Sequence, residues 1–186
     1  MKILLSIIVF LSFAVFSLKQ TFGGKVQTAV WAVVCGIATI CFGNLAISLS
    51  KAEILALINN TSLMKDLAVI ICLETALHIA FCIMAVRAEA EKGHGKNFKF
   101  VFTVLKWFPG VTIFPAAFFL LTALIFSIPG TDFDAIRYTV GGAIMLVLPA
   151  QSYSAAKILP EKDIRTELLF ITSTLLAMAS ILLSMK

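Results

Sequence analysis

Two ionisable residues, Glu74 and His78, stand four positions apart in the stretch Ile71–Val86, which is otherwise mostly apolar. On a helix this spacing puts both side chains on one face, where a carboxylate and an imidazole can reach each other. Such a pair can have similar energy in its ionic and neutral forms, which is what a proton relay needs. Either group is costly in hydrocarbon unless it finds a partner. The pair therefore predicts a proton relay or a contact with another helix.

A structural role for this pair is the alternative. The two side chains can neutralise each other, or bond to polar residues of neighbouring helices, and so fix the helix packing. The sequence offers Asn44, Thr103, Gln151 and Tyr153 as such partners. Both interpretations stay open at this point.

No metal, cofactor or catalytic residue is predicted. A closed metal site needs about four ligands, whereas Glu74 and His78 supply two, and the other histidine, His94, lies in a polar loop. We find no GxSxG elbow, HExxH helix, Walker loop or glycine-rich dinucleotide fingerprint in the sequence. The four cysteines lie inside apolar segments and form no CxxC motif.

A second polar cluster follows Pro149, where residues 151–154 read Gln-Ser-Tyr-Ser inside an apolar segment. A proline can open the backbone hydrogen-bond ladder, and polar groups at depth are tolerated where they line a cavity. Asn44, Gln151 and Tyr153 are therefore candidate cavity-lining residues. The competing interpretation is that the small residues nearby simply permit close helix packing.

The composition is that of an integral membrane protein. Of 186 residues, 60% are hydrophobic and only 13% are charged, and the mean hydropathy is +1.02, outside the balance of soluble domains. The polar gaps are too short to fold around a core of their own. We expect residues 1–186 to form a single, all-α, polytopic transmembrane domain with the lipid bilayer as its surroundings.

Six apolar segments are each close to the length of about 20 residues that a bilayer requires. The first is interpreted as a retained helix and not as a cleaved signal peptide, because it ends in Lys-Gln-Thr-Phe without a small-residue cleavage site. The predicted spans are Lys2–Leu18, Val26–Leu49, Leu67–Val86, Phe108–Ile128, Ile136–Ala156 and Thr166–Met185.

Two further segments are expected at the membrane surface. Asn97–Trp107 alternates phenylalanine with lysine and is interpreted as an interfacial anchor, with Pro109 in the first turn of the following span. Ala52–Ile58 is a short apolar piece that follows the second span and lies on the opposite side of the membrane.

The lysines and arginines predict the orientation. The loops after the first, third and fifth spans hold nine of them, against five on the other side, so the positive-inside rule puts both termini outside the cytoplasm. The nine are Lys19, Lys25, Arg87, Lys92, Lys96, Lys99, Lys157, Lys162 and Arg165, and the five are Lys2, Lys51, Lys65, Arg137 and Lys186. This loop bias explains the net charge of +5 without nucleic-acid binding.

These observations favour a non-enzymatic subunit of a larger complex in a bacterial inner membrane, linked to proton-driven or energised transport, with other membrane subunits as partners. A small-solute transporter or substrate-binding membrane component is the second hypothesis, with a small molecule as its ligand. An intramembrane enzyme is the third, and it requires a Ser, Thr or Asp within hydrogen-bond reach of His78.

Overall fold

The computed structural model describes residues 2–90, 95–128 and 132–185, and every regular element within them is a helix. The predicted roles of Lys92, His94 and Lys186 fall outside these residues. Five of the helices are long and apolar enough to cross a membrane. They are α1 (Lys2–Gln20), α2 (Lys25–Ser48), α4 (Thr61–Ala90), α7 (Phe133–Ile158) and α8 (Lys162–Ser184).

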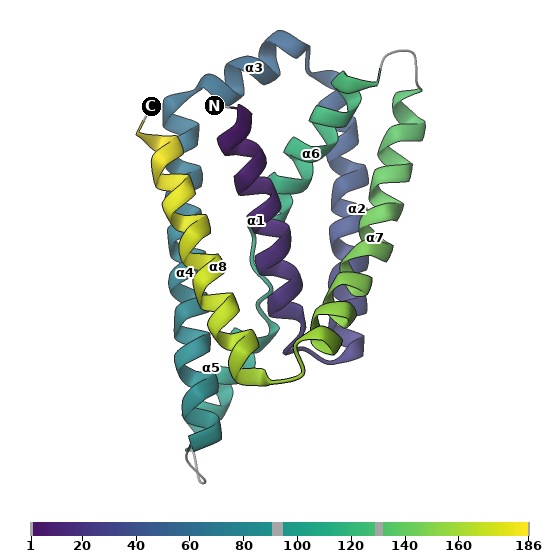
Figure 1. Cartoon of the computed structure of the whole chain (residues 1–186). Coiled ribbons are helices and arrows are strands. Elements are labelled where there is room, and N and C mark those ends of the chain that lie inside the picture. Colours follow the sequence, from purple (N-terminus) through teal and green to yellow (C-terminus); the bar gives the residue numbers. More distant parts are fainter. Residues whose placement is uncertain (1, 91–94, 129–131, 186) are drawn as a thin grey trace.

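The long helices form two packed pairs around a central helix (Figure 1). Helix α2 packs along α7, α4 packs along α8, and α1 lies between them in contact with α6, α7 and α8. Buried apolar side chains of α1, α4 and α8, among them Val15, Ile71 and Leu176, form one core, and those of α2, α6 and α7 form two smaller ones, to one of which Phe16 of α1 also belongs. The arrangement buries each long helix on one side and leaves large apolar side chains exposed on the other, as expected of a protein with a lipid-facing surface.

The pair of α2 and α7 owes its close approach to glycine. A Cβ atom added to Gly36 would lie 2.9 Å from the carbonyl oxygen of Gly141, and one added to Gly141 would lie 3.0 Å from the carbonyl oxygen of Gly36. Small residues at such a crossing let two backbones approach closely, and the resulting van der Waals packing helps to drive helix association in lipid. Pro149 lies inside α7, and the helix continues through it to Ile158.

The pair of α4 and α8 is joined by hydrogen bonds as well as by apolar contacts. The Thr75 hydroxyl donates to the carbonyl oxygen of Ser173 at 3.2 Å, and the Cys82 thiol donates to that of Thr166 at 3.6 Å. Helices in lipid are often connected by such small polar groups. The face of α4 that contains these two residues also contains Glu74 and His78, and it therefore points into the bundle.

The described residues also form three shorter helices: α3 (Lys51–Asn59), α5 (Lys96–Trp107) and α6 (Ile113–Ser127). Helix α3 crosses one end of the bundle between α2 and α4, and α5 lies at the other end (Figure 1). Helix α3 begins with a capping box, in which the side chains of Ser50 and Glu53 each accept a hydrogen bond from the other residue's backbone N–H group. None of the residues of α5 is buried.

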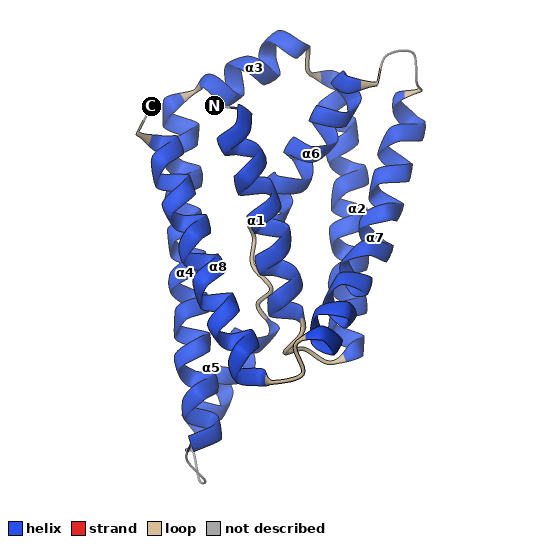
Figure 2. Ribbon diagram, viewed as in Figure 1, coloured by secondary structure: helices blue, strands red, loops and turns tan. Residues whose placement is uncertain are grey.

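The segment predicted as the fourth span, Phe108–Ile128, is only partly helical. After α5 ends at Trp107 the chain runs without regular structure to residue 112, and α6 then provides 15 helical residues; Figure 2 shows this stretch as a loop between α5 and α6. The prediction that Pro109 occupies the first turn of a helix is wrong. Pro109 and Gly110 interrupt the helix instead, because proline lacks an N–H group and Gly110 has a φ of 110°.

Candidate functional site

The carboxylate of Glu74 holds the start of α6. Its Oε2 atom accepts hydrogen bonds from the backbone N–H groups of Val111, at 2.7 Å, and Thr112, at 2.8 Å. Its Oε1 atom accepts one from the Thr112 hydroxyl, also at 2.8 Å. Both N–H groups belong to residues just before α6, namely Val111 and the N-cap residue Thr112, and a carboxylate is a strong acceptor for such groups. Glu74 therefore holds the N-cap of a helix that begins inside the bundle.

Gly110 makes room for this cap. A Cβ atom at this position would overlap Oε1 of Glu74, and the positive φ is one that L-residues rarely adopt. Thr112 is 2% exposed and Glu74 is 4% exposed, so the two hydrogen bonds between them are buried, where charge-assisted bonds are strongest.

His78 lies one turn from Glu74 on α4 and is 1% exposed. Its Nδ1 atom is 3.4 Å from the Ser173 hydroxyl of α8, and the backbone carbonyl of Pro109 lies within range of the ring. Among the described residues, Nε2 has no hydrogen-bond partner, and no hydrogen bond or ion pair joins His78 to Glu74. The two residues share a face, as their spacing requires, but each one contacts a different neighbouring element. Their predicted role as a proton relay or interface contact stays a prediction.

The Ser173 hydroxyl lies 3.4 Å from Nδ1 of His78, as an intramembrane enzyme would need, but its surroundings do not favour catalysis. Its exposed fraction is 0%, and neither Ser173 nor His78 is among the residues that line the cavities described below. A nucleophile has to reach a substrate carbonyl or phosphorus atom. In the structure this pair is enclosed by α4 and α8.

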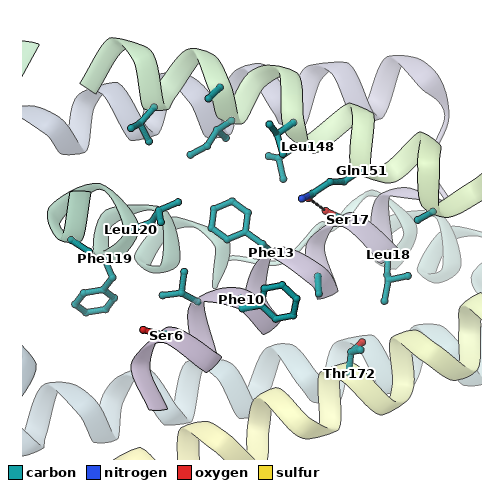
Figure 3. A pocket seen from close by; sticks show the side chains of 18 of the residues that line it. Ser6, Phe10, Phe13, Ser17, Leu18, Phe119, Leu120, Leu148, Gln151 and Thr172 are labelled. Atoms are coloured by element: carbon teal, nitrogen blue, oxygen red, sulfur yellow. Dashed lines mark hydrogen bonds between the residues drawn. The ribbon is translucent and has the colours of Figure 1, made fainter. Parts of the chain in front are cut away.

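A large apolar cavity lies between α1, α6, α7 and α8 and has a volume of about 940 Å³. Figure 3 shows side chains of α1, α6, α7 and α8 around it, with Phe10, Phe13 and Leu148 among those labelled. Four of the lining residues carry polar side chains, namely Ser6, Ser17, Gln151 and Thr172. The size is within the range of roughly 300–1,000 Å³ that is typical of ligand pockets.

Gln151 is the predicted cavity residue that the structure does bring to this cavity. Its Oε1 atom accepts a hydrogen bond from the Ser17 hydroxyl at 2.9 Å, drawn as a dashed line in Figure 3. The next residue, Ser152, donates to the carbonyl oxygens of Leu148 and Ser17. The polar run after Pro149 thus joins α7 to α1 and gives a mostly apolar cavity one hydrogen-bonded polar pair.

The other two predicted cavity residues lie elsewhere. The Asn44 side chain of α2 accepts a hydrogen bond from Arg137 of α7, and Arg137 also pairs with Asp134 at 3.0 Å. Tyr153 is 47% exposed and is absent from the lining of the large cavity. Asn44 therefore takes part in helix pairing near the end of α2, and Tyr153 points to the outside of the bundle.

The sequence interpretation missed Lys19, a buried lysine at the end of α1. The side chain is 2% exposed, its Nζ atom lies 2.9 Å from the centre of the Phe81 ring of α4, and Nζ has no hydrogen-bond partner among the described residues. An ammonium group over an aromatic face is an attractive contact. Lysines at span ends usually extend to water, and the sequence contains no signal that this one is enclosed.

Comparison with family models, curated proteins and solved structures found no match to this chain. Its function is therefore argued from the cavity and from the buried polar groups alone. Among the described residues, no group of three or more His, Cys, Asp or Glu side chains is arranged to hold a metal ion.

Proposed function

We propose that this protein is a non-enzymatic integral membrane component that binds an apolar, lipid-like molecule between α1, α6, α7 and α8. The observation that carries the proposal is the cavity of about 940 Å³, whose walls are apolar except for four side chains. An apolar lining with a few convergent polar groups is the usual form of a small-molecule site. The hydrogen-bonded pair of Ser17 and Gln151 is suited to a hydroxyl or carbonyl group on such a ligand.

The position of the cavity supports a ligand drawn from the bilayer. Helices α7 and α8 are not among the closely packed helix pairs, and Phe10 of α1, which lines the cavity, is 72% exposed. A cavity with such a wall can exchange its contents sideways with lipid. A polar solute would gain little there, because it would lose its hydration without finding partners.

The contacts of Glu74 and His78 in the structure favour proton-driven transport less than their spacing in the sequence does. A relay needs groups that exchange protons with water or with each other, whereas Glu74 is engaged in three hydrogen bonds to α6 and neither residue lines the large cavity. We therefore favour binding of a lipid-like molecule over transport of a small polar solute.

The topology that we propose has six crossings, with Phe108–Ile128 as the fourth, a bacterial inner membrane as the location and both termini outside the cytoplasm. The fourth crossing would combine an extended stretch with α6. The orientation rests on the lysine and arginine distribution in the sequence. A cysteine-accessibility experiment on residues of α3 and α5 tests it, because these two helices lie at opposite ends of the bundle.

The ligand proposal is tested by filling the cavity. Ala143 of α7 lines it, so Ala143→Trp should exclude a ligand, whereas Ala76→Trp on the exposed side of α4 adds the same bulk elsewhere. A spin-labelled fatty acid is added to the full chain in a mild detergent. We expect an immobilised spectral component with the wild type and with Ala76→Trp, and its loss with Ala143→Trp.

Equal immobilisation by all three proteins would contradict the proposal. Mass spectrometry of lipids that remain bound after purification gives a second readout without a probe. If the wild type retains no lipid, and instead holds a second chain that Ala143→Trp releases, the subunit of a larger complex is the better description.

A further inference from the structure

A second pocket, of about 290 Å³, lies at the end of the bundle where α1 and α4 end, α5 lies and α8 begins. It is separate from the large apolar cavity, with which it shares no lining residue. Aromatic side chains form part of its wall: Phe22 after α1, Phe81 of α4 and Phe102 of α5. The Phe81 and Phe102 rings are stacked, with centroids 5.6 Å apart, and the Phe22 ring meets Phe81 edge-on.

Charged residues form a second part of the wall, with more cations than carboxylates. Lys106, Lys162 and Arg165 line the pocket together with Glu89 and Asp163. The one ion pair that these carboxylates make among the described residues joins Glu89 to Lys162 at 3.7 Å. Asp163 lies in the first turn of α8. The pocket therefore carries net positive charge, which favours an anionic ligand.

Arg165 gives the pocket a cation that is fixed in place. Its side chain is 9% exposed, and its Nη1 and Nη2 atoms donate to the carbonyl oxygens of Thr21, at 3.1 Å, and Pro160, at 3.5 Å. The guanidinium also lies 5.5 Å from the centre of the Phe22 ring. Carbonyl oxygens and a ring hold the group without neutralising its charge, and its Nε atom has no partner among the described residues.

A further basic side chain contacts the wall. The Lys19 amino group lies over the pocket's Phe81 ring, without a hydrogen-bond partner for Nζ in the described part of the chain. A nearby anion favours the charged form of an amino group. An anion in the adjoining pocket would therefore stabilise Lys19 in its charged form.

The start of α8 adds a third favourable element. Its N-cap residue, Glu161, makes no side-chain capping bond, and its first-turn residues Lys162 and Asp163 line the pocket. Free N–H groups at a helix N-terminus attract anions. Here that terminus coincides with the buried Arg165 and with Lys106 from another helix, so three elements direct positive charge at one volume.

We propose that this pocket binds a phosphate-type anion, presented by the headgroup of an anionic lipid or by a free phosphate. Helix α5, which has lysines, phenylalanines and no buried residue, lies at the same end of the bundle and is typical of helices at headgroup level. Basic pockets between transmembrane helices at that depth recognise lipid phosphates. This proposal does not depend on the ligand of the large cavity.

The test uses the full chain in micelles of a neutral maltoside detergent. Binding of phosphatidylglycerol and of phosphatidylcholine is followed by native mass spectrometry, with inorganic phosphate added in a parallel series. The double variant Lys106→Gln/Lys162→Gln removes two cations from the wall. The control Lys96→Gln/Lys99→Gln removes two exposed lysines of α5 that do not line the pocket.

We expect the wild type and the control to prefer phosphatidylglycerol, and the pocket variant to bind it about 25-fold more weakly, from roughly fivefold for each of its two lysines. If millimolar phosphate displaces phosphatidylglycerol from the wild type and has no such effect on the pocket variant, the site is assigned to a free anion. Equal lipid preference in all three proteins, without such competition by phosphate, would overturn the proposal. Glu89→Gln leaves every cation in place and should tighten binding, and weaker binding in this variant would also count against an anion site.

Discussion

Glu74 and Thr112, which are 38 residues apart in the chain, share two hydrogen bonds of 2.8 Å, one to the backbone N–H and one to the hydroxyl of Thr112. Together with the bond from Val111, they attach the start of α6 to the middle of α4. The carboxylate that the sequence presents as a proton-relay or interface candidate accepts, in the structure, the hydrogen bonds of the residues just before α6. Substitutions at this contact therefore test how the bundle is held together.

Replacement of Glu74 by glutamine should destabilise the protein by about 3 kcal/mol, because a buried charged acceptor with several donors is lost. Unfolding in mixed detergent micelles, followed by circular dichroism, measures the change. Asp66→Asn on the same helix removes an exposed carboxylate and should change stability by less than about 0.5 kcal/mol. In a Thr112→Val background the effect of Glu74→Gln should shrink, since the two residues act together. Strictly additive effects would show that the cap contributes little.

Gly110→Ala should also be destabilising, by about 2 kcal/mol, because its Cβ would overlap the Glu74 carboxylate and its φ is positive. Gly95→Ala is the matched control, because a Cβ there meets no atom within 4 Å and no positive φ is required. The same unfolding assay applies. Equal stability of the two variants would mean that the chain does not pass Glu74 as closely as described.

Two adjacent glycines of α7 should respond in opposite directions to alanine. Gly141→Ala places a Cβ 3.0 Å from the Gly36 carbonyl oxygen of α2 and should destabilise the protein by about 1–3 kcal/mol. Gly142→Ala meets nothing within 4 Å and should stabilise it by up to about 1 kcal/mol, since alanine favours helix. Thermal unfolding of the two variants side by side measures the difference, and a stabilising Gly141→Ala would exclude the close α2–α7 crossing.

The start of α3 should depend on pH. The pKa of Glu53 is lowered mainly by the hydrogen bond from the Ser50 backbone N–H and to a smaller extent by the Ser50 side chain. Because the folded pKa lies below the unfolded value, the stabilisation is present above the usual glutamate range and is lost as the pH falls through the lowered pKa. NMR titration of the Glu53 side chain should show this low pKa. Ser50→Ala should raise it toward the ordinary value, and an unchanged titration would contradict the capping box.

The sequence was sufficient for the class of fold, because long apolar segments in a chain with few charges leave little choice but membrane helices. It also predicted short separate segments near α3 and α5, the first as a short apolar piece and the second from its alternation of phenylalanine with lysine. It did not predict the interruption at residues 108–112, because hydropathy is continuous from Phe108 to Ile128. The Pro109–Gly110 dipeptide was the available signal, since this pair breaks helices in most contexts.

The candidate site was harder to predict, because its contacts join distant parts of the chain. Gln151 was selected for its polarity, but its partner Ser17 is 134 residues away, and no local pattern connects the two. Lys19 was counted among the loop cations, whereas its Nζ atom lies over the Phe81 ring. Burial of this kind is decided by how helices pack, and single-sequence periodicity does not contain that information.

The short length of α6 has a consequence for how the protein is made. Its 15 residues span about 22 Å at 1.5 Å per residue, less than the bilayer core of about 30 Å. A segment of that length, preceded by proline and glycine, inserts poorly when it leaves the ribosome on its own. We expect α6 to enter the membrane against an already inserted α4, whose Glu74 then accepts the hydrogen bonds of Val111 and Thr112. The order of synthesis and the order of assembly would then be the same.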